Sequence, residues 1–137
     1  MQTSCFSRYT GDNGVAICRC AQRDFKGPTY SDLKPDKETF NLIKAGHIDQ
    51  AEYEERYRRN TLMKLDPQKV YNDLKGKVLL CWEKPIFDTD GKIINKGSGF
   101  CHRHIVSKWI AETLDISVHE WRTPREIAQI KNSIQLF

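Results

Sequence analysis

The 137-residue sequence has none of the short motifs that identify the common classes of nucleotide-binding and hydrolytic enzymes. It lacks a G-x-x-x-x-G-K-[ST] phosphate-binding loop, a dinucleotide-binding G-x-G-x-x-G and a G-x-S-x-G nucleophile elbow. A cysteine phosphatase is disfavoured, because the sixth residue after Cys101 is Ser107 and not arginine. No run of about 18 apolar residues is present, and the amino terminus has neither a basic leader nor an apolar segment. We therefore expect no membrane association and a cytoplasmic location.

Cysteine is present five times, an odd number, and no C-x-x-C pair occurs. Together with the absence of an export signal, this predicts reduced thiols and no disulfide. Cys18 and Cys20 flank Arg19, so within a strand both thiols would face one side of the sheet, where small buried residues are the simplest interpretation. The net charge of +4 permits an anionic ligand, and it makes nucleic-acid binding conceivable but not favoured.

Apolar periodicity and capping residues predict strands alternating with helices. The last helix begins after Thr123 and repeats Ile127, Ile130 and Ile134 at helical spacing. This pattern predicts one α/β domain spanning 1–137, a Rossmann-like three-layer structure with a mostly parallel sheet and helices on both faces. We expect strands at 3–6, 15–20, 78–82 and 116–121, and helices at 36–45, 49–65, 67–74, 101–114 and from 124 onward.

Polar residues follow the strand at 78–82 and begin the helix at 101–114. The apolar run of the strand ends in Cys81, Trp82 and Glu83, and the helix begins with Cys101, His102 and Arg103. Cys18 and Arg19 lie near the end of the predicted strand 15–20. Ligands of parallel sheets bind outside the carboxyl ends of the strands. The sequence therefore predicts that these side chains meet at one rim.

Three residues of this rim have a predicted chemical role and a simpler alternative. Cys101, in the first turn of a helix and beside Arg103, is a plausible nucleophile, or it is a buried cysteine that seats the helix. Arg103 would bind a phosphate or carboxylate, or it would pair with Glu83 across the loop. Glu83 would act as an acid or base, or it would simply be solvated.

Zinc is a weaker possibility, because the spacing of cysteine and histidine is poor for a metal site. Cys101 and His104 are three residues apart on the predicted helix and would need Cys81 as a third ligand. We therefore predict no metal and no cofactor.

Two loops adjoin the predicted rim. The first, 21–35, carries Lys26 and Tyr30, which would reach a ligand's charge and ring, or would merely help to cover the core. The second, 86–99, is predicted to be a hairpin-like insertion that turns at Asp90 and Gly91.

The order of the segments TSCF, AICR, FKGPTYSDLKP, EYEERY, LDPQKVYNDL, VLLCWEKP and FCHRHIVSKWI resembles the family catalogued as domain of unknown function 488. The most specific part is CWEKP followed by CHRH. The resemblance implies a small α/β domain, found chiefly in prokaryotes and their viruses and suspected of enzymatic activity. The residues that match it are Lys26, Gly27, Tyr30, Pro35, Cys81, Glu83, Lys84, Pro85, Cys101, His102 and Arg103. Two features depart from the family pattern. Cys20 stands where relatives often have glycine, and the 86–99 loop is longer than the usual link.

These observations favour an enzyme that acts on a small anionic substrate, such as a nucleotide or nucleoside derivative. In that hypothesis Arg103, Lys26 and the helix start hold the anion, Tyr30 or Trp82 stacks on a ring, and Glu83 or Cys101 performs the chemistry. One alternative is a binding module without turnover, virus-encoded for instance, which holds a nucleotide or a protein. A second alternative is a nucleic-acid binder. The oligomeric state is not indicated by the sequence.

Overall fold

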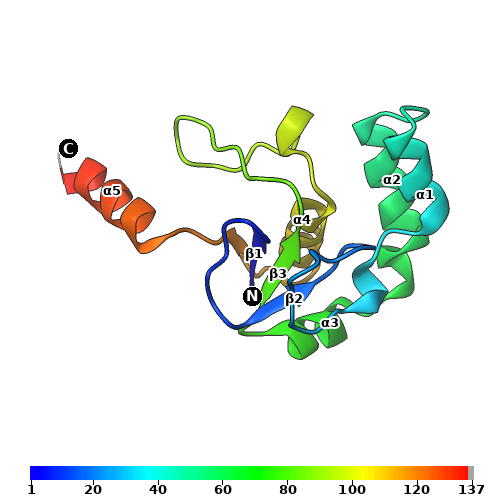
Figure 1. The fold of residues 1–137 in the computed structure, drawn as a ribbon, viewed down its shortest axis with the longest axis horizontal. Coiled ribbons are helices and arrows are strands. Elements are labelled where there is room, and N and C mark those ends of the chain that lie inside the picture. The colour runs from blue at the N-terminus through cyan, green and yellow to red at the C-terminus, as the bar shows by residue number, and fades with distance from the viewer. Residues whose placement is uncertain (136–137) are drawn as a thin grey trace.

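The computed structural model describes residues 1–135, with side chains described as far as residue 130. Four strands form one all-parallel sheet in the order β2-β3-β1-β4. This is an α/β fold of the predicted class, and Figure 1 shows its sheet between the helical segments. The strands are β1 (Gln2–Cys5), β2 (Gly14–Ala16), β3 (Val78–Cys81) and β4 (His119–Glu120). The helices are α1 (Lys37–Lys44), α2 (Gln50–Asn60), α3 (Pro67–Leu74), α4 (His102–Leu114) and α5 (Pro124–Gln135).

β3 lies between β2 and β1, and all four of its residues are buried. Such a continuous apolar run is typical of a parallel strand that is covered on both faces. Cys81 pairs with Cys5 of β1, and Leu80 pairs with Ala16 of β2. The carboxyl ends of these three strands consequently lie at the same edge of the sheet.

Most helices begin at the capping residues that the sequence indicates. Asp36, Asp49 and Asp66 each accept a hydrogen bond from a backbone N–H in the first turn of α1, α2 and α3. At α5, Thr123 and Glu126 form a reciprocal capping box: each side chain accepts from the other residue's N–H, at 3.1 Å. The starts at Asp49, Asp66 and Thr123 confirm the N-caps that the sequence predicts, whereas the cap at Asp36 is seen only in the structure.

α4 has no such cap. Cys101 precedes it in an extended conformation, and the Cys101 N–H donates instead to the side chain of Asn95, at 2.9 Å. α4 then packs on β1 and β3, with Ile105, Val106 and Ile110 fully buried. The end of the 86–99 loop therefore holds the start of α4 against the edge of the sheet.

Three strands are shorter than predicted, and β3 is so by the single residue Trp82. β2 ends at Ala16, not at Cys20, because the chain bends away after Ile17 donates its last ladder bond to the Leu80 carbonyl. The thiols of Cys18 and Cys20 therefore do not share a face: Cys18 is buried and Cys20 is exposed. β4 is limited to His119–Glu120, which pair with Gln2 and Thr3 of β1, and its last bond to β1 runs from the Trp121 N–H to the Thr3 carbonyl.

Residues 86–94 form the predicted hairpin-like turn, in which Phe87 bridges Ile93 in antiparallel fashion. The Asp88 side chain accepts the N–H groups of Asp90 and Lys92, and Gly91 has a φ of 80°, a value that favours glycine. The guanidinium of Arg122, in the segment before α5, lies 4.1 Å from the centre of the Phe87 ring. The hairpin is thus tied to the carboxyl-terminal segment.

α5 projects from the rest of the molecule (Figure 1). Its first turn is held by an ion pair between Glu126 and Arg8, while Ile127 and Ile130 remain partly exposed. The side chain of Ile134 lies outside the described residues. Among the described helices, none is long and apolar enough to cross a bilayer.

Candidate functional site

The junction between β3 and α4 brings together Cys81, Cys101 and His102, here called the thiol–imidazole cluster. Their Sγ and ring nitrogen atoms all lie within 4.8 Å of one another, and all three residues are buried. The Cys81 Sγ is 3.5 Å from His102 Nδ1. On the other side of the ring, His102 Nε2 lies 2.8 Å from the backbone oxygen of Ile17. The predicted meeting of the strand end and the helix start is therefore present in the structure.

Cys18, just beyond β2, lies beside this cluster. It belongs to a small buried group with Ala16, Cys81 and Cys101, against which Phe6 and Phe25 pack. The Cys18 Sγ donates to the backbone oxygen of Cys20, at 3.1 Å. The sequence favours a packing role for Cys18 and places it near a strand end, and the pairing of β2 with β3 is what brings it next to Cys81.

A cavity of about 230 Å³ opens above the cluster, and we call it the strand-end pocket. The cluster and Cys18 lie at its floor, and Arg19 and Glu83 also line it. Its walls are mostly aromatic and apolar, formed by Phe40, Ile43, Tyr53, Trp82 and Phe100. Typical small-molecule pockets measure roughly 300–1,000 Å³. This one has room for a single ring system, with the rest of a ligand outside.

Trp82 forms one side of the pocket and is fixed there although it is 49% exposed. Its indole Nε1 donates to the backbone oxygen of Cys20, at 2.6 Å, and its ring meets Phe6 edge to face at 5.3 Å between centroids. An exposed indole that is held in one orientation offers a ready surface for stacking.

The buried groups perturb one another's ionisation. Burial opposes ionisation of Cys101, but contacts with Cys81 and His102 and the charge of Arg103 outweigh it, so the pKa of this thiol is well below its ordinary value. Contacts with Cys101 and Cys18 raise the pKa of Cys81. The contact with Cys81 lowers the pKa of Cys18 to about 7. Partial burial, and then the negative charge of Cys101, raise the pKa of Glu83. Two thiols of the group thus ionise more readily than ordinary cysteines.

Arg103 lies beneath the pocket and does not line it. Its Nε and Nη2 donate to the two carboxylate oxygens of Glu120, at 3.1 and 2.9 Å, and the two side chains are 0% and 2% exposed. Thr3 donates its hydroxyl to the same carboxylate, at 2.7 Å. Of the two alternatives weighed from the sequence, the structure thus places an ion pair at Arg103, with Glu120 rather than Glu83 as its partner.

His104, which the zinc hypothesis had used, lies on the far side of α4 from the cluster and faces Glu120, 4.0 Å from its carboxylate. Burial, and then the positive charge of Arg103, lower the pKa of His104 to about 4, so its ring is neutral at pH 7. The helical spacing argument pointed to His104 because it treated Cys101 as helical. Cys101 is instead the extended residue before α4, and His102 is the histidine beside the thiols.

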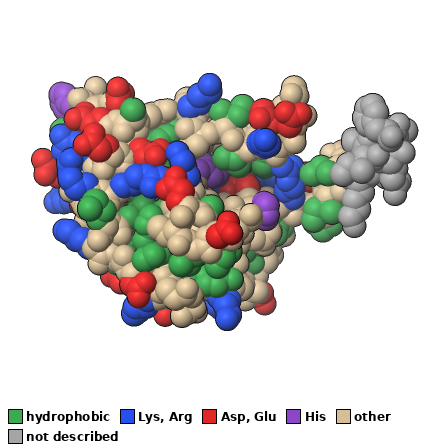
Figure 2. Space-filling model, turned by 180° about the vertical axis from the view of Figure 1, so that it is seen from behind, with side chains coloured by type: hydrophobic (Ala, Val, Ile, Leu, Met, Phe, Trp, Pro, Cys, Tyr) green, Lys and Arg blue, Asp and Glu red, His purple; other side chains and the backbone are tan. Residues whose placement is uncertain are grey.

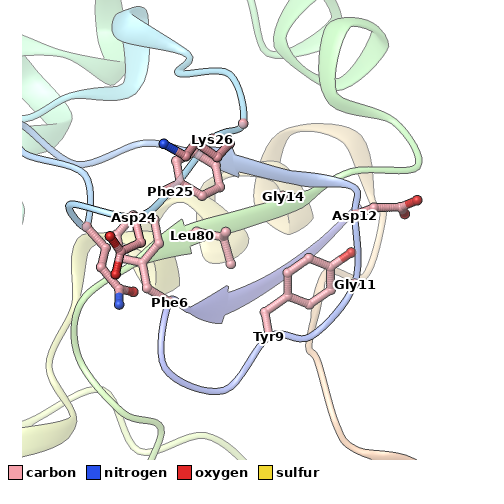
Figure 3. Close-up of a pocket in the computed structure, with 11 residues that line it drawn as sticks. Phe6, Tyr9, Gly11, Asp12, Gly14, Asp24, Phe25, Lys26 and Leu80 are labelled. Carbon is pink, nitrogen blue, oxygen red and sulfur yellow. The ribbon is translucent and has the colours of Figure 1, made fainter.

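Lys26 and Tyr30 are not brought to the strand-end pocket. The Tyr30 hydroxyl donates to Asp73 of α3, at 2.7 Å. Lys26 lines a separate, wider pocket on the face of the sheet opposite α4, whose floor is Leu80 and Gly14 (Figure 3). Phe25, from the same loop, packs on Phe6. Phe25, Tyr30 and Leu33 of the 21–35 loop therefore pack on the core, while Lys26 remains exposed at the other pocket.

The charged side chains on the face shown in Figure 2 are of both signs, with Lys and Arg lying among Asp and Glu. Several of them form pairs along α2, including Arg58 with Glu54 and Arg59 with Glu55. This face has no continuous basic surface of the kind that binds nucleic acid.

No protein-family model matches the chain. Searches of curated proteins and of solved structures also find no match.

Proposed function

We propose that this chain is an enzyme whose strand-end pocket receives the ring of a small nucleotide or nucleoside derivative. The observation that carries the proposal is a cavity of ring size with aromatic walls, over a floor that holds two thiols and an imidazole. Pockets of this kind, apolar with a few convergent polar groups, are the usual form of small-molecule sites. The position outside the carboxyl ends of β2 and β3 is the usual one in parallel sheets.

The walls account for recognition of a planar ring. Trp82 offers an indole face at the mouth, and Phe100 and Phe40 line the pocket with it. Stacking of a base on an aromatic side chain contributes about 1–3 kcal/mol. Arg19 lies at the rim, and its guanidinium donates to the Pro35 carbonyl, at 2.9 Å. In this proposal Arg19, rather than Arg103, attracts the phosphate or other anionic part of the ligand.

Groups at the floor and rim of the strand-end pocket would take part in the reaction. Cys101 and Cys81 supply sulfur groups at the floor, and Glu83 supplies a carboxylate on the same pocket. A carboxylate beside an apolar wall is suited to exchanging a proton with a bound molecule. The likeness of CWEKP and CHRH to the domain of unknown function 488 family supports the same location, and we keep a distant relationship to that family as part of the proposal.

The proposal is tested with a panel of bases, nucleosides and nucleotides. Binding is measured by thermal shift and calorimetry, and conversion is measured by chromatography of the products. Trp82→Ala should weaken binding about tenfold or more, because one stacking surface is lost. Glu83→Gln should keep binding and lose turnover. Glu55→Gln, an exposed carboxylate of α2, is the matched control and should change neither.

Each of three results would contradict one part of the proposal. If no member of the panel binds, the pocket is not a ring site. If a ligand binds but Glu83→Gln converts it at the wild-type rate, Glu83 has no chemical role. Tight binding without any product would instead favour the binding module.

A further inference from the structure

We propose that Cys81, Cys101 and His102 hold one divalent ion of the zinc class at the floor of the strand-end pocket. The binding of the ion is independent of the proposed function. Only its use on a substrate rests on that function.

The first observation is distance. The Cys81 Sγ and His102 Nδ1 are 3.5 Å apart. Zn–S and Zn–N bonds of about 2.3 and 2.0 Å at a tetrahedral angle place a sulfur and a nitrogen ligand about 3.6 Å apart. All three ligand atoms lie within 4.8 Å of one another, so an ion fits among them with small movements of the side chains.

The second observation is the orientation of the imidazole. A carbonyl oxygen only accepts hydrogen bonds, so the 2.8 Å contact with Ile17 requires the proton to be on His102 Nε2. In the neutral ring, Nδ1 then carries a lone pair on the side of the Cys81 sulfur, where the ion would lie; a protonated ring would release its Nδ1 proton on binding the ion. Histidine ligands of metals usually donate their other ring N–H to a carbonyl or carboxylate in this manner. A histidine that only filled space beside two thiols would not need this arrangement.

The third observation is that the protein presents the three groups rigidly. Cys81 is the last residue of β3, and the N–H of Cys101 is held by Asn95, at 2.9 Å. His102 opens α4, whose next turns are buried against the sheet. Rigid presentation on a strand end and a helix start favours a site over a chance contact of mobile side chains.

The donor set selects the kind of ion. Two thiolates and one imidazole suit zinc and related transition metals, whereas magnesium and calcium prefer oxygen ligands. Both sulfurs would bind as thiolates, with any thiol proton still present released to solvent, and the two thiolate charges would balance the double charge of the ion. A neutral centre suits a buried position.

The structure leaves the fourth position of this ion open. Cys18, the one other thiol of the group, is turned to the Cys20 carbonyl at 3.1 Å. The strand-end pocket lies directly over the cluster, and Glu83 lines it too. Three protein ligands with an open position are the arrangement of catalytic zinc sites, whereas structural sites have four. If the proposed function holds, a water molecule or a substrate atom would occupy this position.

Metal binding is measured on wild-type protein stripped of metal, by titration with zinc and with cobalt(II). We expect about one equivalent to bind, with a dissociation constant below about 1 μM. We also expect the cobalt complex to show thiolate charge-transfer absorption and the strong ligand-field bands of tetrahedral geometry. Cys81→Ser, Cys101→Ser and His102→Gln should each weaken binding at least about a hundredfold. Cys5→Ser, a buried cysteine outside the cluster, is the matched control and should not change the affinity.

A second readout needs no variant. Zinc should protect Cys81 and Cys101 from alkylation in the wild-type protein, while the exposed Cys20 stays reactive. Failure of wild-type protein to bind zinc or cobalt overturns the site, as does an octahedral cobalt spectrum without thiolate absorption. Cys18→Ser should keep the affinity within about threefold; loss of metal in that variant would show a closed four-ligand site and overturn the open position. Nucleoside binding to metal-free protein tests the proposed function separately.

Discussion

Replacing Arg103 by methionine should destabilise the fold strongly, although the sequence alone had suggested Arg103 as a ligand-binding residue. The change removes one partner of a pair that is 0% and 2% exposed and leaves Glu120 charged and buried. It also removes two hydrogen bonds, from Nε and Nη2. Breaking a buried ion pair by removing one partner costs about 3–5 kcal/mol. For a chain of this length, about 0.29 kcal/mol shifts the midpoint by one degree, so the melting temperature should fall by about 10–17 °C.

The assay is thermal and urea unfolding followed by circular dichroism. Arg59→Met is the control, because the Arg59–Glu55 pair is exposed and is worth less than about 0.5 kcal/mol. The double variant Arg103→Met with Glu120→Leu should recover most of the loss, because it leaves no buried charge. The reasoning would be refuted if Arg103→Met unfolded within a degree or two of Arg59→Met.

Two further predictions concern single hydrogen bonds, one between distant segments and one at a helix cap. Tyr57→Phe should lower the free energy of unfolding by about 1–3 kcal/mol, measured by urea unfolding, because the buried Leu33 carbonyl loses its 2.7 Å donor; an unchanged midpoint would contradict this. Asp36→Ala should cost about 1 kcal/mol at pH 7 through loss of the α1 cap. Although burial opposes it, hydrogen bonds from Thr39 and Asn60 hold the pKa of Asp36 below its ordinary value. The difference in the free energy of unfolding between wild type and Asp36→Ala should therefore be constant above about pH 4, and it should shrink as the pH falls through the lowered pKa of Asp36. A difference that grew on acidification would refute this role of Asp36.

The sequence was sufficient to predict the part of the site that is local in the chain. A buried strand that ends in Cys81 and a helix that begins after Cys101 have to meet at one edge of a parallel sheet, and they do. The capping residues Asp49 and Asp66 likewise act over two or three residues, so their effect can be read directly from spacing.

What the sequence did not reveal depends on contacts between distant segments. Glu120 was read as part of an edge strand, and nothing in its neighbours shows that β4 pairs with β1 and so delivers it to Arg103. The position of Cys18 depends on β2 pairing with β3, an order that alternating strands and helices do not determine. Whether His102 or His104 lies beside the thiols depends on the residue at which α4 begins. A shift of one residue along a helix rotates the direction of a side chain by about 100°.

We propose that the strand-end pocket, and not the wider pocket on the face of the sheet opposite α4, is the site of function. Nuclear magnetic resonance mapping of a ligand from the nucleoside panel on isotopically labelled protein distinguishes the two pockets. We predict that the indole N–H of Trp82 and the amides of Glu83, Phe100 and Cys101 shift on addition of the ligand, while the indole of Trp121 does not. Shifts centred on Gly14 and Leu80, the floor of the other pocket, with an unmoved Trp82 indole, would contradict the account.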